Sequence, residues 1–125
     1  MNVVYDAGIL VAAEKGERWA WAEHRLRLET GVVPLVVSNV VAQVSRSARQ
    51  ANLRRFLRGC EVRTFDEARA HRAGVLLGRS KTTDVVDASV VELALDARAE
   101  IVTTDPRDIA RLVAASGKTV DVTIR

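Results

Sequence analysis

The chain has 125 residues, a formal net charge of +3 and 48% apolar side chains, mostly valine, alanine and leucine. That length suits one domain, which we expect to span residues 1–125. The single cysteine, Cys60, excludes an internal disulfide and a thiolate zinc cluster. No apolar run approaches the roughly 18 residues of a membrane span, and the N-terminus does not resemble a signal peptide, so we expect a cytoplasmic protein.

The predicted elements alternate between short strands and longer helices. In chain order they are a strand at 3–5, helical sequence over 9–29 broken at Gly16, a strand at 32–37, a helix capped by Ser38, a basic helix over 46–58, a strand at 61–65, a helix from Asp66 to Gly78, a helix over 84–97, a strand at 100–104, a helix from Asp105, and a strand at 120–124. This βαβ alternation predicts an α/β fold with one largely parallel sheet between two helix layers.

Acidic residues stand where predicted strands give way to helices. They are Asp6, Asp84, Asp87, Asp105 and Asp108. The strand ends at one edge of a parallel sheet converge, so carboxylates distant in sequence can meet there around one divalent cation. Without a cation, neighbouring carboxylates would repel one another and raise each other's pKa.

Helix capping is the competing explanation for two pairs of these residues. Asp84 with Asp87, and Asp105 with Asp108, are each three apart at a predicted helix start, the spacing of an N-cap and a first-turn acid. Asp108 is best explained as such a helix-start residue. Capping does not account for Asp6, which follows a strand and precedes two small residues.

In this order the motifs resemble those of PIN domains, especially the small VapC-like toxins. The matching residues are Asp6 after a strand, Gln43 in a helix, Asp87-Ala88 in an apolar helix, and Thr103-Thr104-Asp105 at a strand end. The resemblance spans essentially the whole chain. It implies a metal-dependent endoribonuclease with Mg²⁺ or Mn²⁺, usually a homodimer, acting as the toxin of a type II toxin–antitoxin pair with a cognate antitoxin.

The resemblance also assigns roles to single residues. It implies that Asp6 is the central metal ligand, that Asp87 and Asp105 complete the site directly or through water, and that Asp84 is an auxiliary acid. Thr104 would position water or phosphate, although a β-branched strand residue needs no such role. The chain departs from the pattern at Gln43, where these toxins carry glutamate. Glutamine can coordinate through its amide oxygen but brings no negative charge, so metal affinity should fall.

Gln43 shares a helical stripe with Val40 and Val44, so we expect it to point inward. The best candidates for RNA phosphate contacts are five arginines in the basic helix, Arg46, Arg49, Arg54, Arg55 and Arg58. A solvent-exposed helix face explains these arginines about as well. We expect Trp19 and Trp21 to be buried in the core or an interface. His24 and His71 lie in charged helical sequence and are predicted to face solvent.

Two other classes of protein stay open. One is a PIN fold that keeps its acidic pocket but binds RNA or a protein partner without cutting, and Gln43 best discriminates this hypothesis from an active nuclease. The other is a receiver-like phosphate-handling domain, which has similar length and acidic strand ends. It fits poorly, because the usual acidic pair after the first strand and a matching late lysine are not evident.

Overall fold

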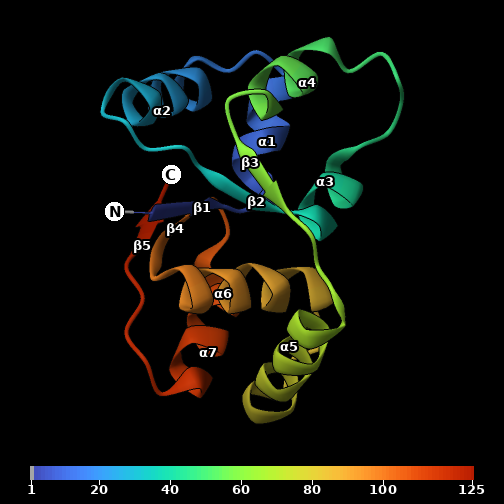
Figure 1. Ribbon diagram of the computed structural model, residues 1–125, viewed down its shortest axis with the longest axis vertical. Coiled ribbons are helices and arrows are strands. Elements are labelled where there is room, and N and C mark those ends of the chain that lie inside the picture. The colour runs from blue at the N-terminus through green and yellow to red at the C-terminus, as the bar shows by residue number, and fades with distance from the viewer. Residues whose placement is uncertain (1) are drawn as a thin grey trace.

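Within residues 2–125, which the computed structural model describes, a five-stranded sheet runs through the centre of the molecule (Figure 1). Its strands lie in the order β3-β2-β1-β4-β5, and every neighbouring pair is parallel. Their bounds are β1 Asn2–Tyr5, β2 Leu35–Val37, β3 Glu61–Arg63, β4 Ala99–Thr103 and β5 Val122–Ile124. The predicted parallel sheet is confirmed. Met1, which begins the predicted domain, lies outside the described residues.

Helices cover both faces of the sheet. Their bounds are α1 Ala7–Glu14, α2 Arg18–Glu29, α3 Ser38–Val44, α4 Ala51–Leu57, α5 Glu67–Ser80, α6 Val85–Ala97 and α7 Pro106–Ser116. In Figure 1, α1, α2 and α4 lie above the sheet, and α5, α6 and α7 lie below it. The predicted three-layer α/β/α architecture is therefore confirmed. No helix in the described part of the chain is long and apolar enough to cross a membrane.

Several predicted helix ends are confirmed by backbone geometry. Gly16 takes a φ of +74°, which glycine adopts without the steric penalty of a side chain, and it separates α1 from α2. Asp66 caps α5, because its carboxylate accepts a hydrogen bond from the Arg69 backbone N–H at 2.9 Å. Asp84 caps α6 as predicted.

The prediction of one helix over 46–58 is wrong. Residues 45–50 form a loop, and α4 begins only after it. The Gln50 side chain holds this loop, since its Oε1 accepts from the Arg46 backbone N–H at 2.7 Å and its Nε2 donates to the Val44 carbonyl at 3.0 Å. These bonds compete with the helical hydrogen bonds that the composition predicts.

Two other helix boundaries also differ from the prediction. Gly78 does not end α5, which continues until Lys81 adopts a left-handed φ of +57°. Ser38 is not an N-cap, because Val37 occupies that position before α3. The Ser38 hydroxyl instead accepts a hydrogen bond from the Phe65 backbone N–H at 2.9 Å, joining the start of α3 to the chain after β3.

The strands are mostly shorter than predicted. β2 begins at Leu35 rather than residue 32, β3 ends at Arg63 and β5 begins at Val122, while β4 is displaced by one residue from the predicted 100–104. Pro34 precedes β2 and has no N–H with which to extend a ladder. The outer strands β3 and β5 are the least buried, whereas β1, β2 and β4 supply the centre of the core.

The core contains a histidine that the sequence predicts to be exposed. His24 is only 4% exposed, its ring stacks on Phe56 with centroids 3.9 Å apart, and its Nδ1 lies 3.2 Å from the Tyr5 hydroxyl. The prediction is wrong because α2 turns this position toward the aromatic core. Burial lowers the pKa of His24, although a hydrogen bond with the Phe56 backbone opposes this. His71 is exposed, as predicted.

Candidate active site

Asp6 stands at the junction of β1 and α1. It is 6% exposed, and both oxygens of its carboxylate are engaged. Oδ1 accepts from the Ala7 backbone N–H at 2.8 Å, and Oδ2 accepts from the Thr103 hydroxyl at 2.7 Å. Burial raises the pKa of Asp6, the two hydrogen bonds oppose that shift, and the charges of Asp105 and Asp84 add to it. These aspartates are therefore electrostatic neighbours.

Thr103 links two of the acidic residues and was missed by the sequence reasoning, which considered Thr104 instead. Its fully buried hydroxyl donates to Asp6 and accepts from the Asp105 backbone N–H at 3.1 Å. The register of β1 and β4, which pairs Tyr5 with Val102, sets the next residues of both strands side by side. A polar residue at the buried end of a strand was the signal that could have identified Thr103.

Asp84 and Asp87 lie at the start of α6. Asp84 Oδ1 accepts from the Asp87 backbone N–H at 3.0 Å, so the capping role of Asp84 is confirmed. The Asp87 carboxylate makes no hydrogen bond to the described chain and is partly buried. Burial, together with the charges of Asp6, Asp84, Asp108 and Asp105, raises the pKa of Asp87 to about 7.

The start of α7 differs from the capping explanation. Asp105 occupies the N-cap position, but its side chain makes no capping hydrogen bond. Asp108, predicted to be only a helix-start residue, also acts on the cluster, because its charge contributes to the raised pKa of Asp87. Capping therefore accounts for Asp84 but not for Asp105, and the acidic cluster gains a fifth carboxylate.

No protein-family model matches the chain, and neither does any curated protein sequence. Among solved structures, it resembles a chain of VapBC2 from Rickettsia felis bound to a DNA fragment from its promoter, with a TM-score of 0.78, 20% identity, and coverage of 100% of this chain and 99% of that one. It also resembles a chain of a toxin–antitoxin complex from Klebsiella pneumoniae, with a TM-score of 0.69, 20% identity, and coverage of 87% and 91%. The chain shares their fold. The PIN-like fold predicted from the sequence is thereby confirmed.

Gln43 does not point inward as the sequence predicts. It is exposed, and its amide makes no hydrogen bond to the described residues. The prediction that it points inward is wrong, since α3 buries Val40 and Val44 but leaves Gln43 exposed. An inward amide would have required buried partners, and at this position water can supply them.

Thr104 approaches the backbone of α1 closely. A Cβ added to Gly8 would lie 1.9 Å from the Thr104 Oγ1, so only glycine fits at that position without a shift. Thr104 is exposed and, with Ala7 and Gly8, borders a surface hollow of about 370 Å³. The hydroxyl is thus accessible from solvent where β4 ends.

The carboxylates suit a hard divalent cation in donor type and charge but do not form a closed cage. Over residues 2–125, no three His, Cys, Asp or Glu side chains are grouped closely enough to hold a metal. Mg²⁺ retains several waters and is commonly held by one or two carboxylates rather than an all-protein cage. The residues present therefore fit a partly hydrated cation, which would also relieve the repulsion that raises the pKa of Asp87.

The five predicted phosphate-binding arginines do not act as one group. Four of them line a surface hollow of about 400 Å³ beside α4, namely Arg49, Arg54, Arg55 and Arg58. No acidic residue lines this hollow. Arg46 instead donates to the Ser45 carbonyl at 2.7 Å, near the end of α3. Trp19 and Trp21 are partly buried against the core, and the Arg55 guanidinium lies 4.6 Å from the centroid of the Trp21 ring.

Proposed function

We propose that the chain is a metal-dependent endoribonuclease and the toxin of a type II toxin–antitoxin pair. The observation that carries the proposal is the clustering of Asp6, Asp84, Asp87 and Asp105, in which burial and like charges raise the pKa of Asp87 to about 7. The fold shared with chains of toxin–antitoxin complexes supports it. A cognate antitoxin and a second copy of the chain are the proposed protein partners.

Asp6, Asp87 and Asp105 would hold Mg²⁺ or Mn²⁺ directly or through water, with Asp84 as an auxiliary acid. When bound, the cation supplies a water of lowered pKa and positive charge for the phosphate oxygens. Thr103 fixes the Asp6 carboxylate by donating to its Oδ2. Thr104 presents its hydroxyl to water or phosphate at the end of β4. The resemblance to VapC-like toxins implies that hydrolysis would leave a 3′-hydroxyl and a 5′-phosphate and would not require the RNA 2′-hydroxyl.

The arginine hollow on α4 is the proposed site for RNA phosphates. In Figure 1 the loop after α3 leads up to α4 on the outer side of the molecule. Arg49, Arg54 and Arg58 have no acidic partner within the described chain, so their charges are free to meet a polyanion. Arg46 is also proposed to contact RNA phosphate, for which its guanidinium would have to release the backbone carbonyls that it now contacts.

Cleavage of end-labelled total and transfer RNA by purified protein tests this function. We expect discrete cuts in Mg²⁺ or Mn²⁺ that disappear in EDTA and in Asp87→Asn, the matched preparation that excludes a contaminating nuclease. The cut ends should carry 3′-hydroxyls and 5′-phosphates. Cuts that persist at the same rate in Asp87→Asn would show that the acidic cluster is not the active site.

A PIN-like module that binds without cutting is the second candidate. Gln43 favours it, because an exposed neutral amide adds no charge at the position where VapC-like toxins carry glutamate. On this alternative, wild-type protein binds RNA without cutting it, and Gln43→Glu restores metal-dependent cuts. If the chain is an active nuclease, Gln43→Glu maintains or raises the rate of cleavage that the wild type already shows.

A further inference from the structure

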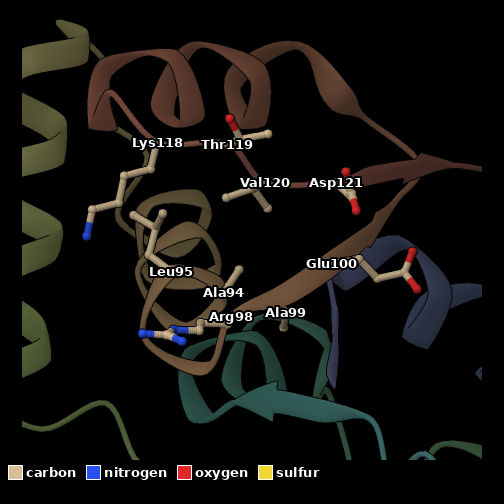
Figure 2. A pocket seen from close by; sticks show the side chains of 9 residues that line it. All are labelled: Ala94, Leu95, Arg98, Ala99, Glu100, Lys118, Thr119, Val120 and Asp121. Atoms are coloured by element: carbon tan, nitrogen blue, oxygen red, sulfur yellow. The ribbon is translucent and has the colours of Figure 1, made fainter. Parts of the chain in front are cut away.

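A second charged site lies away from the acidic cluster, beside the amino-terminal ends of β4 and β5. We call it the basic cleft; it is a hollow of about 480 Å³ between α5, the end of α6 and the chain after α7, and it is lined in part by Arg79, Arg98 and Lys118. It shares Leu95, Arg98 and Lys118 with a neighbouring hollow of about 600 Å³, whose lining residues are shown in Figure 2. Each hollow is large enough for a nucleotide-sized ligand.

The cations of the basic cleft line the same hollow and have no acidic partners within the described residues. Figure 2 shows the charged ends of Arg98 and Lys118 directed to the same side, away from Glu100 and Asp121. Neither side chain forms an ion pair with the described residues, and the same holds for Arg79 on α5. Holding like charges together without a counter-charge raises the free energy of the protein, and an anionic ligand would relieve that cost.

The acids that line the same cleft are already engaged. Glu92 is buried and accepts from Arg69 at 3.0 Å and from Arg72 at 2.8 Å. Asp96 accepts from the second guanidinium nitrogen of Arg69 at 3.0 Å. These pairs neutralise the carboxylates at the α5–α6 contact, so the free charge at the cleft is positive.

An apolar floor lies beside these cations. Val75 on α5 is 53% exposed, and the partly buried Leu95 on α6 is shared by both hollows. We propose that the basic cleft binds a nucleotide phosphate, with the phosphate between Arg98 and Lys118 and the base against Val75 and Leu95. The ligand is either a mononucleotide or one residue of an RNA strand, since both present the same phosphate and base. This site is separate from the acidic cluster and does not depend on the proposed nuclease activity.

Arg98 offers a variant that removes charge without harming the fold. It ends α6 with a left-handed φ of +52°, a position that glycine favours. Arg98→Gly should therefore preserve or improve the helix end while it deletes the guanidinium. Lys118→Gln removes the second cation from an exposed loop. The matched control is Arg18→Gln with Arg25→Gln, which removes two exposed charges from α2.

Binding is measured by NMR titration of the full chain in EDTA with adenosine 5′-monophosphate, inorganic phosphate and a four-nucleotide RNA. We expect amide shifts centred on residues 95–98 and 116–120, and a loss of affinity of about tenfold or more in Arg98→Gly/Lys118→Gln but not in the control. Binding of the monophosphate identifies a mononucleotide site, and binding of the RNA alone identifies a strand site.

Three results would overturn the proposal. They are equal affinity in the double variant and the wild type, shifts confined to α4 or to the acidic cluster, and inorganic phosphate binding as tightly as the monophosphate. The last would remove the role of the apolar floor. Because EDTA excludes a divalent cation, loss of the nuclease proposal leaves this result unaffected.

Discussion

Replacing Asp87 by asparagine should stabilise the protein at neutral and alkaline pH in EDTA. Burial and four neighbouring carboxylates raise the pKa of Asp87 to about 7 from an ordinary value of 3.8. Ionisation is thus harder in the folded than in the unfolded chain. The asparagine variant retains a similar shape but has no charge to bury, so it escapes this cost.

The pH dependence follows from the sign of that shift. An acid whose pKa is raised on folding contributes stability that is fully present below pH 3.8 and is lost as the pH rises to about 7. At about 1.4 kcal/mol per pH unit, this interval sets a ceiling of about 4 kcal/mol. Water around a partly exposed carboxylate screens much of it, which leaves about 1 to 2 kcal/mol. The stability of Asp87→Asn relative to the wild type should therefore increase from pH 4 to pH 7.

The assay is thermal unfolding of both proteins in EDTA from pH 4 to pH 8.5. We expect nearly equal midpoints at pH 4 and a midpoint about 3 to 8 °C higher for Asp87→Asn above pH 7. Asp121→Asn, which changes an exposed aspartate outside the cluster, is the control and should follow the wild type. A constant difference across the range, or a less stable Asp87→Asn at pH 8, would refute the assigned electrostatics.

Three further variants test other parts of the account. Thr103→Val keeps the shape but removes the donor to Asp6, so we expect it to lower the free energy of unfolding by about 1 to 3 kcal/mol in urea and to slow RNA cleavage, whereas unchanged values would deny the bridge a role. Glu92→Gln leaves Arg69 and Arg72 without the carboxylate that they share, so it should lower the free energy of unfolding by about 3 kcal/mol in the same assay. An unchanged free energy of unfolding would show that these ion pairs do not stabilise the α5–α6 contact. His24 has a lowered pKa, so its contribution to stability is lost as the pH falls below about 6.5. Between pH 7 and pH 5 the midpoint should fall further in the wild type than in His24→Phe, and parallel curves would argue against a buried neutral imidazole.

Local sequence patterns were sufficient to predict the sheet and the acidic edge. Valine-rich strands separated by helical sequence indicate a parallel sheet. Asp6 directly follows β1, and Asp105 lies two residues after the end of β4. Parallel topology alone brings such strand ends to one edge. The fold class therefore followed without knowledge of packing, and the metal site at this edge stays a prediction.

The remaining details depend on contacts that sequence patterns do not encode. Thr103 meets Asp6 because of the register between β1 and β4. Asp108 acts on Asp87 because α7 packs against α6. Gln43 is exposed although it shares a helical stripe with the buried Val40 and Val44. In each case the outcome is set by tertiary geometry, which local propensity cannot specify.

Binding of Mn²⁺ to the metal-free protein tests most directly whether the carboxylates form one cation site. The loss of the free-ion electron paramagnetic resonance signal would be measured at pH 7.5 for the wild type, Asp105→Asn and the control Asp121→Asn. We predict saturable binding by the wild type and the control and at least tenfold weaker binding by Asp105→Asn. The reason is that the Asp105 carboxylate makes no capping hydrogen bond and lies close enough to Asp6 for their charges to interact. Equal binding by all three proteins, or no saturable binding by the wild type, would contradict the metal centre.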